Sequence, residues 1–118
     1  LAQALKLAEE GVRQAPAYVD LIDTRGYVLM RMGRYEQAAG EFEKCLRMYI
    51  EKSPKRTSSM FYLSRCLMEM NRLDQAQIEL LRTKRLQEEN GGLTAEQQQQ
   101  MEQSIQRLSR PDDYVRKS

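Results

Sequence analysis

Two carboxylates with a spacing suited to catalysis, Asp20 and Asp23, stand three residues apart in the sequence. Residues three apart share one face of a helix, so the pair has the geometry needed for general acid and base work. A catalytic pair also needs supporting groups, but the chain has no histidine, no glycine-rich nucleotide loop and no serine or cysteine beside an evident base. We therefore predict that both aspartates are solvated carboxylates on a helix face and that this chain is not an enzyme.

The two cysteines, Cys45 and Cys66, are the other residues that could form a covalent bond or bind a metal. Two cysteines are too few for a disulfide framework, and without a histidine the chain lacks the usual ligands of a zinc site. A free cysteine packs as a small apolar group. We predict that both thiols are reduced and lie in the core, and that the chain holds no metal and no cofactor.

Charge and hydropathy narrow the class of partner. The 19 basic and 17 acidic residues are interleaved and leave a net charge of +2, whereas nucleic-acid-binding domains usually present a basic face. No run approaches about 18 apolar residues, the length that spans a membrane. We predict a protein or peptide as partner, with no nucleic acid and no membrane. Because the chain opens on Leu1, we expect it to be a piece of a longer protein, and we expect a cytoplasmic location.

The elements that position these side chains emerge when the sequence is aligned with itself. The segment MGRYEQAAGEFEKCL, from Met32, matches MNRLDQAQIELLRTK, from Met70, and this alignment places Ala38 on Ala76. A shorter copy, ALKLAEEGVRQAP, lies upstream and places Ala4 on Ala38. The spacing from Ala38 to Ala76 exceeds the spacing from Ala4 to Ala38 by close to one helical turn of about 3.6 residues. We therefore predict that the helix after Tyr35 runs one turn longer and continues to Pro54.

The breaks between the predicted helices follow from a few residue types. Gly33 and Asn71 occupy matched positions and both tolerate positive φ, which suits a tight turn inside each helix pair. Thr94 and Gln97 form a predicted capping box before the last helix, and the basic segment EKSPKR is predicted to be a solvated connection. The predicted helices cover residues of about 1–14, 18–32, 35–52, 58–70, 72–89 and 94–108.

The repeated positions resemble the tetratricopeptide repeat family. Its unit, about 34 residues long, is a helix pair with a glycine-like turn, then an aromatic, an alanine, a second aromatic, a small residue and a closing proline. The matching residues are Gly33, Tyr35, Ala38, Phe42 and Cys45, then Asn71, Leu73, Ala76, Leu80 and Thr83, and upstream Ala4, Ala8, Gly11 and Pro16. The sequence departs from the family at Arg25 and Leu80, and its closing proline is either absent or displaced to Pro54.

The resemblance implies an all-α fold, a right-handed superhelical stack of antiparallel helix pairs. Residues 1–108 would form a single domain and residues 109–118 a flexible tail. The parts of that domain would be a half repeat at 1–16, repeats at 17–54 and 55–92, and a capping helix at 93–108. A generic antiparallel helical bundle is the alternative fold.

The resemblance also implies where a partner binds, because in this family the first helix of each pair lines a concave groove for extended peptides or helices. Carried over to this sequence, the groove residues are Asp20, Asp23, Tyr27, Met30 and Arg31 in the first pair and Phe61, Tyr62, Arg65, Met68 and Glu69 in the second. Aromatic, methionine and arginine side chains suit such contacts. For Phe61, Met30 and Met68, packing between repeats stays open as the alternative.

Two classes of function follow from this prediction. The first is a protein-interaction scaffold. Some family members hold a partner's C-terminal carboxylate, but Asp20 and Asp23 would repel it, so we do not predict that clamp. With Asp20 and Asp23 at one end of the groove and Arg65 further along, the partner would carry mixed charge. The second is a structural role, in which the segment forms a homodimer through the exposed apolar side of its N-terminal half repeat, packs on further repeats or docks to a neighbouring domain. A third role would be regulation of a neighbouring catalytic domain.

Overall fold

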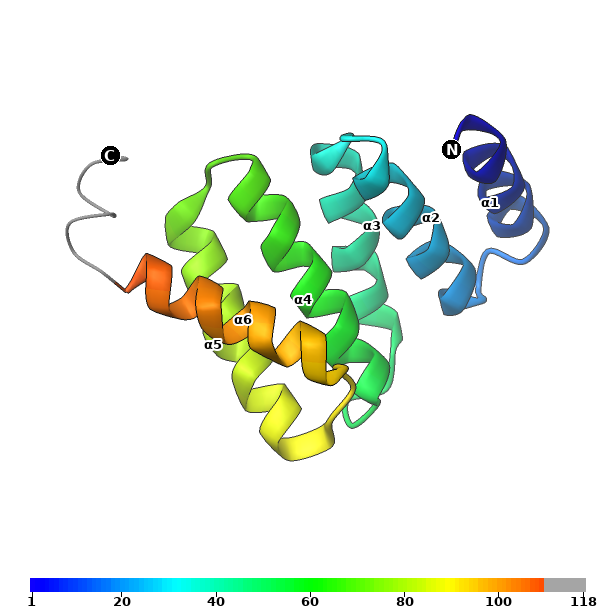
Figure 1. The fold of residues 1–118 in the computed structure, drawn as a ribbon. Helices are drawn as coiled ribbons and strands as arrows, with labels where there is room; N and C mark the ends of the chain where they lie inside the picture. The colour runs from blue at the N-terminus through cyan, green and yellow to red at the C-terminus, as the bar shows by residue number, and fades with distance from the viewer. Residues whose placement is uncertain (110–118) are drawn as a thin grey trace.

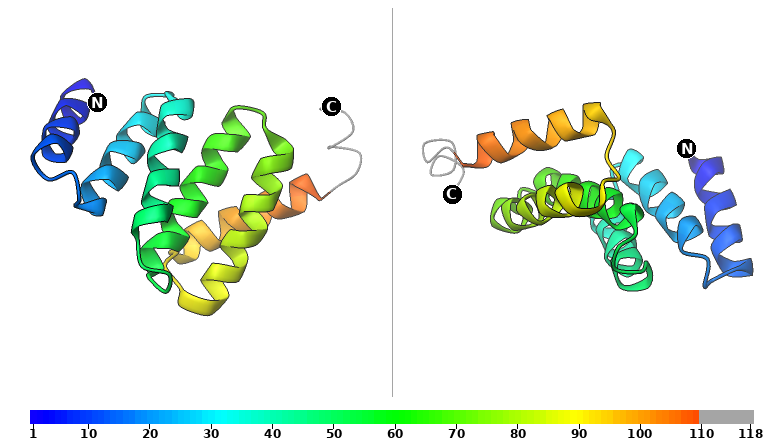
Figure 2. Two further views of the ribbon diagram at one scale, coloured as in Figure 1. Left: turned by 180° about the vertical axis from the view of Figure 1, so that it is seen from behind. Right: turned by 90° about the horizontal axis from the view of Figure 1, so that it is seen from below.

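In the computed structural model, which describes residues 1–109, two antiparallel helix pairs stack side by side between two further helices (Figure 1). The pairs are α2 with α3 and α4 with α5; α1 packs on α2, and α6 lies over α4 and α5 on the side that α2 also occupies (Figure 2). The predicted all-α stack of helix pairs is thus confirmed. The helices are α1 (Ala2–Gln14), α2 (Val19–Arg31), α3 (Tyr35–Met48), α4 (Pro54–Glu69), α5 (Leu73–Asn90) and α6 (Ala95–Leu108).

The turn inside each pair is the same structure built twice. Gly33 has φ +79° and Asn71 has φ +58°, as their matched positions predicted. In the first turn the Arg34 amide donates to the Leu29 carbonyl at 2.9 Å, and in the second the Arg72 amide donates to the Leu67 carbonyl at 2.9 Å. These bonds satisfy carbonyls that a helix end would otherwise leave unpaired.

The prediction that the helix after Tyr35 continues to Pro54 is wrong. Helix α3 ends at Met48, because Tyr49 turns extended at φ −67° and ψ 144°. Ser53 then caps α4 by accepting the Lys55 amide, and Pro54 occupies the first turn, where its missing N–H costs nothing. Hence only the first three residues of the segment EKSPKR lie in the connection, and its last three form the first turn of α4. The extra length of the second repeat lies mainly in α4, which has 16 residues against 13 in α2.

The core follows the repeated positions. Ala38 and Ala76 are 0% exposed, and the larger residues that follow them, Phe42 and Leu80, are 0% and 1% exposed. Both cysteines are free and fully buried, as predicted. Because α4 lies between α3, α5 and α6, it also buries polar residues, among them Ser64, whose hydroxyl donates to the Met60 carbonyl at 2.9 Å.

Helix α6 begins as predicted. The Gln97 amide donates to the Thr94 hydroxyl at 3.1 Å, and the Gln97 side chain accepts from the Thr94 amide at 3.0 Å, which completes the capping box. Three apolar residues of one face, Met101, Ile105 and Leu108, join the core. Of the predicted tail at 109–118, only Ser109 belongs to the described residues. Within residues 1–109 no helix combines the length and the apolar character needed to cross a membrane.

Candidate functional site

One face of the stack carries a row of side chains that steps from α2 to α4 and on to α6. The rings of Tyr27 and Tyr62 meet edge to face with centroids 5.4 Å apart. The Gln97 side-chain amide donates to the Tyr62 hydroxyl at 3.1 Å, and one turn further on Arg65 donates to the Gln100 side chain at 3.1 Å. The two tyrosines and two glutamines therefore link the three helices that bound this face.

A groove of about 460 Å³ lies over this row. Its volume is in the range of about 300–1,000 Å³ that is usual for ligand pockets. Six of the ten residues predicted to bind a partner line it, joined by the first turns of α6. The lining residues are Tyr27, Met30, Arg31, Phe61, Tyr62, Arg65, Thr94, Glu96, Gln97 and Gln100.

The remaining predicted residues of α4, Met68 and Glu69, line a second, smaller hollow of about 220 Å³ between α4 and α6. Phe61 and Arg65 reach both hollows, so the two are continuous along α4. The hydrogen bond between Arg65 and Gln100 lies where they meet. The structure thus brings eight of the ten predicted residues to one surface.

Exposure separates side chains that can touch a partner from those that support the surface. Tyr27 is 39% exposed, and Arg31 and Arg65 are also exposed. Phe61 is only 2% exposed, so the packing role left open in the sequence analysis describes it better than partner contact. Met30 and Met68 are half-buried against the core.

Tyr27 and Tyr62 are held in place by packing against other aromatic rings and by Arg31. Tyr62 stacks on Phe42 with ring centroids 5.6 Å apart and contacts the edge of Phe61 at 5.5 Å. Arg31 donates to the Tyr27 hydroxyl at 3.2 Å, and its guanidinium lies 6.0 Å from that ring centroid. Since each aromatic ring is held by a neighbour, the groove presents a surface that is already ordered before a partner binds.

Asp20 and Asp23 lie apart from this groove, in a polar cluster that joins α2 to α3 and α4. Lys55 pairs with Asp20 at 2.8 Å, and the Tyr49 hydroxyl donates to Asp20 at 2.8 Å and lies 3.3 Å from Asp23. Ser59 donates to Asp23 at 3.4 Å. Asp23 is therefore half-buried rather than solvated, whereas Asp20 stays 38% exposed in its ion pair with Lys55. Neither aspartate lines the groove.

The two aspartates of the cluster have opposite pKa shifts. The hydrogen bonds from Lys55 and Tyr49 lower the pKa of Asp20, because they favour the charged carboxylate. Burial raises the pKa of Asp23, because the carboxylate loses hydration, and this outweighs its hydrogen bonds from Tyr49 and Ser59. The charge on Asp20 therefore stabilises the fold, and the charge on Asp23 destabilises it.

We expect Asp20→Asn to lower the free energy of unfolding at pH 7 by about 1 kcal/mol at most, because an exposed ion pair is lost. A group with a lowered folded-state pKa contributes stability above its unfolded pKa of about 3.9 and loses it as pH falls further. The deficit of Asp20→Asn should accordingly shrink as pH falls below the unfolded pKa toward the lowered folded-state pKa. Asp23→Asn is the matched control and should raise stability at pH 7. Urea unfolding at pH 7 and pH 3 measures both, and a shift of the same sign for the two variants at pH 7 would contradict the assignment.

The two thiols are buried and protonated. Burial raises the pKa values of Cys45 and Cys66 to about 12, so neither thiol supplies a thiolate nucleophile at neutral pH. Within residues 1–109, no cluster of three or more histidine, cysteine or acidic side chains could hold a metal ion.

Sequence reasoning missed the contribution of α6 to the groove. The helix was predicted only as a cap, yet its residues Glu96, Gln97 and Gln100 line the groove. A signal was present, because the step in sequence from Tyr62 to Gln97 equals the step from Tyr27 to Tyr62. This equal spacing was hard to recognise, because the third position is a glutamine within a run of glutamines and not an aromatic residue.

Comparison with known proteins gives one match. A family model described as tetratricopeptide repeat matches residues 29–90, which is more than half of the chain. The matched region begins near the end of α2 and includes α3, α4 and α5. Searches of curated proteins and of solved structures gave no significant match.

Proposed function

Because this chain belongs to the tetratricopeptide repeat family, whose members typically act as non-catalytic protein-interaction scaffolds, we propose that it binds a peptide segment of a partner protein in the groove over α2, α4 and α6. The observation that carries the proposal is the pairing of the exposed Tyr27 with the half-buried Tyr62 between two arginines, Arg31 and Arg65. Tyrosine and arginine are the residue types that most often dominate binding energy at protein interfaces.

The charges beside the row indicate the chemistry of the partner. Arg31 and Arg65 offer guanidinium donors to a carboxylate, and among the described residues Glu96 is the one acidic side chain lining this groove. Since Asp20 and Asp23 are occupied in their own cluster, the earlier expectation of a partner with mixed charge shifts toward an acidic one. We propose a segment that places an apolar side chain between the tyrosines and a carboxylate near an arginine.

The test uses peptides selected from a displayed random library on the intact chain. For the selected peptides we expect Tyr27→Ala with Arg65→Ala to raise the dissociation constant by about tenfold or more, since loss of one hot-spot residue costs about 2 kcal/mol or more. The melting temperature should change little, because both side chains are exposed. The matched control removes the same residue types elsewhere: Tyr18→Ala with Arg85→Ala should bind as the wild type does. Equal affinity for the groove variant and its control would overturn the proposal.

A second candidate function, self-association through α1, has an observation of its own. Ala4 is exposed, although its counterparts Ala38 and Ala76 are 0% exposed beneath the first helices of their pairs. Leu1 and Leu7 at the same end of the chain are 62% and 68% exposed. A second copy would cover this apolar side. Light scattering across micromolar concentrations decides the matter, because a strict monomer excludes self-association through α1.

A further inference from the structure

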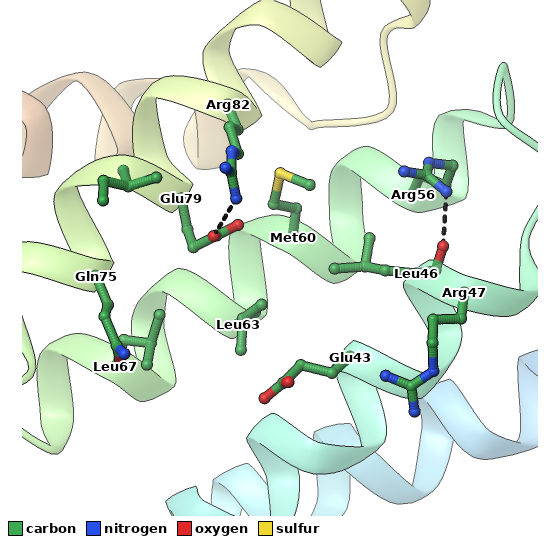
Figure 3. Close-up of a pocket in the computed structure, with 11 residues that line it drawn as sticks. Glu43, Leu46, Arg47, Arg56, Met60, Leu63, Leu67, Gln75, Glu79 and Arg82 are labelled. Carbon is green, nitrogen blue, oxygen red and sulfur yellow. Dashed lines mark hydrogen bonds and ion pairs between the residues drawn. The ribbon is translucent and has the colours of Figure 1, made fainter.

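A third hollow lies on the other side of α4 from the groove, between α3 and α5. Helices α3 and α5 form its walls and α4 its floor, and its volume is about 480 Å³ (Figure 3). We call it the outer slot. The residues that line it are Glu43, Leu46, Arg47, Arg56, Met60, Leu63, Leu67, Gln75, Ile78, Glu79 and Arg82.

Helix α4 lines the groove with one face and the outer slot with the opposite face. It gives Phe61, Tyr62 and Arg65 to the groove, whereas Met60, Leu63 and Leu67 face the outer slot. The latter three are spaced by three and four residues, so they form one apolar ridge along the helix. The ridge is 5–8% exposed, which leaves part of it open at the bottom of the slot.

The walls of the outer slot also carry apolar side chains. Ile78 of α5 is 51% exposed, and Leu46 of α3 is half-buried. Figure 3 shows the polar wall residues of α5, Gln75, Glu79 and Arg82, on one side of the ridge and those of α3 on the other. An apolar trough with polar walls is the form of surface that an amphipathic segment covers.

The backbone chemistry of the slot favours a helix over an extended peptide. All three bounding segments are helices whose backbone groups are paired internally, so they offer no strand edge to an extended chain. A helix satisfies its own backbone groups, and its side-chain ridges fit the space between two parallel walls. The floor from Arg56 to Leu67 corresponds to about three turns at about 1.5 Å per residue.

The charged side chains of the outer slot indicate which way a bound helix would run. At the end where Leu46 lies, Arg56 donates to the Leu46 carbonyl at 2.6 Å, and its Nε atom is buried without a hydrogen-bond partner. Within residues 1–109 neither Arg56 nor Arg47 makes an ion pair with a carboxylate, whereas Arg82 is paired with Glu79 at 2.8 Å. The Leu46 end therefore carries positive charge that an acidic residue and a helix C-terminus would complement.

We propose that the outer slot binds an amphipathic helix of a partner protein, about three turns long, with acidic residues toward its C-terminal end, at Arg47 and Arg56. Its apolar stripe packs on Met60, Leu63 and Ile78. The chain then holds two partner segments at once, a peptide in the groove and a helix in the outer slot. The second site is independent of the first, because the two share no lining residue.

The test starts from a displayed library of helical peptides, each about 15 residues long because shorter helices are marginal in isolation. Apolar residues stand at helical spacing and all other positions are random. Peptides are selected on the full chain and measured singly. We expect Ile78→Glu to weaken their binding tenfold or more, because it places a charge on the wall. Equal affinity for Ile78→Glu and the wild type would overturn the proposal.

The matched control is Leu81→Glu. Leu81 lies on the same helix with the same 51% exposure but outside the slot, so its replacement should leave affinity within twofold. Equal losses in both variants, or selected peptides that need Tyr27 instead, would also overturn the proposal.

The direction of the helix has its own readout. The selected peptides should be enriched in aspartate and glutamate toward their C-terminal ends, and Arg47→Glu should reverse that preference. Lys44→Glu, on the same helix but outside the slot, should not. Selection of extended peptides rather than helices would contradict the proposal. A dimer of the wild type that Ile78→Glu converts to a monomer would also contradict it, by showing that a second copy occupies the slot.

Discussion

Phe42→Ala lowers the free energy of unfolding by about 3–5 kcal/mol, which is the expected cost of truncating a fully buried phenylalanine. Phe42 is 0% exposed and fills the space between α2 and α3 at Gly26, where the missing side chain leaves room for the ring. It also supports Tyr62, whose ring stacks on it at 5.6 Å. Because domains of this size are stable by only about 5–15 kcal/mol, the loss is a large share of the total. Urea unfolding followed by circular dichroism measures it.

The close approach of Phe42 to Gly26 gives this prediction a control. A Cβ added at Gly26 would lie 3.0 Å from the Phe42 ring, so Gly26→Ala should destabilise the wild type by overpacking. In the Phe42→Ala background the ring is absent, and the same methyl group should cost less or stabilise the helix. We therefore expect the double variant to be more stable than the sum of the single effects implies. Strict additivity would show that the two residues do not form the contact that closes the helix pair.

Gly92→Ala is the second change with a large expected effect, a loss of about 3 kcal/mol or more, from backbone strain combined with overpacking. Gly92 has φ +121°, a conformation that other residues rarely adopt, and it lies against the first turn of α4. A Cβ there would clash with the Pro54 carbonyl oxygen and would lie 3.1 Å from the Thr57 Cβ. Since this connection sets α6 on α4, the variant should also lose affinity for groove-binding peptides although no groove residue has changed.

The matched control for Gly92→Ala is Gly33→Ala. Gly33 also has positive φ, at +79°, but no atom lies within 4 Å of an added Cβ. Its replacement should cost only the conformational penalty of about 1–2 kcal/mol and should leave peptide affinity unchanged. Urea unfolding and a fluorescence titration on both variants separate the two costs. Equal losses of stability would contradict a decisive contact between Gly92 and the start of α4.

Much of the fold was predictable because it depends on short-range signals that recur in the chain. Each turn requires a residue that tolerates positive φ, and Gly33 and Asn71 meet that need at matched positions of the two helix pairs. The same register identified the buried layer, since Ala38, Ala76, Phe42 and Leu80 are all at most 1% exposed. A family model matches this same region, residues 29–90.

The errors have a common cause, which is that they concern contacts between distant segments. Tyr49 leaves the helical conformation where its hydroxyl reaches Asp20 on another helix, and α3 ends about one turn early. The same contact removes the aspartates from the groove. Periodicity along α3 shows none of this, because the local sequence remains compatible with a helix.

The candidate site, too, was predictable only in part from the sequence. The family resemblance predicted that α2 and α4 line a groove, and Tyr27, Tyr62, Arg31 and Arg65 of these helices line the one observed. The sequence did not show which of the neighbours Phe61 and Tyr62 is buried. Phe61 is 2% exposed and Tyr62 is half-buried, because different parts of the fold pack against them.

By itself, the sequence determined the repeat, its two turns and the buried residues at the repeated positions, because periodicity and φ preferences act within a few neighbouring residues. Only the tertiary structure decided that α6 completes the groove, that Asp20 and Asp23 are occupied by Lys55, Tyr49 and Ser59, and that α3 and α5 leave a slot over α4. Those features depend on how helices from the whole chain approach one another, and that placement is set by the sum of many weak contacts between segments far apart in sequence.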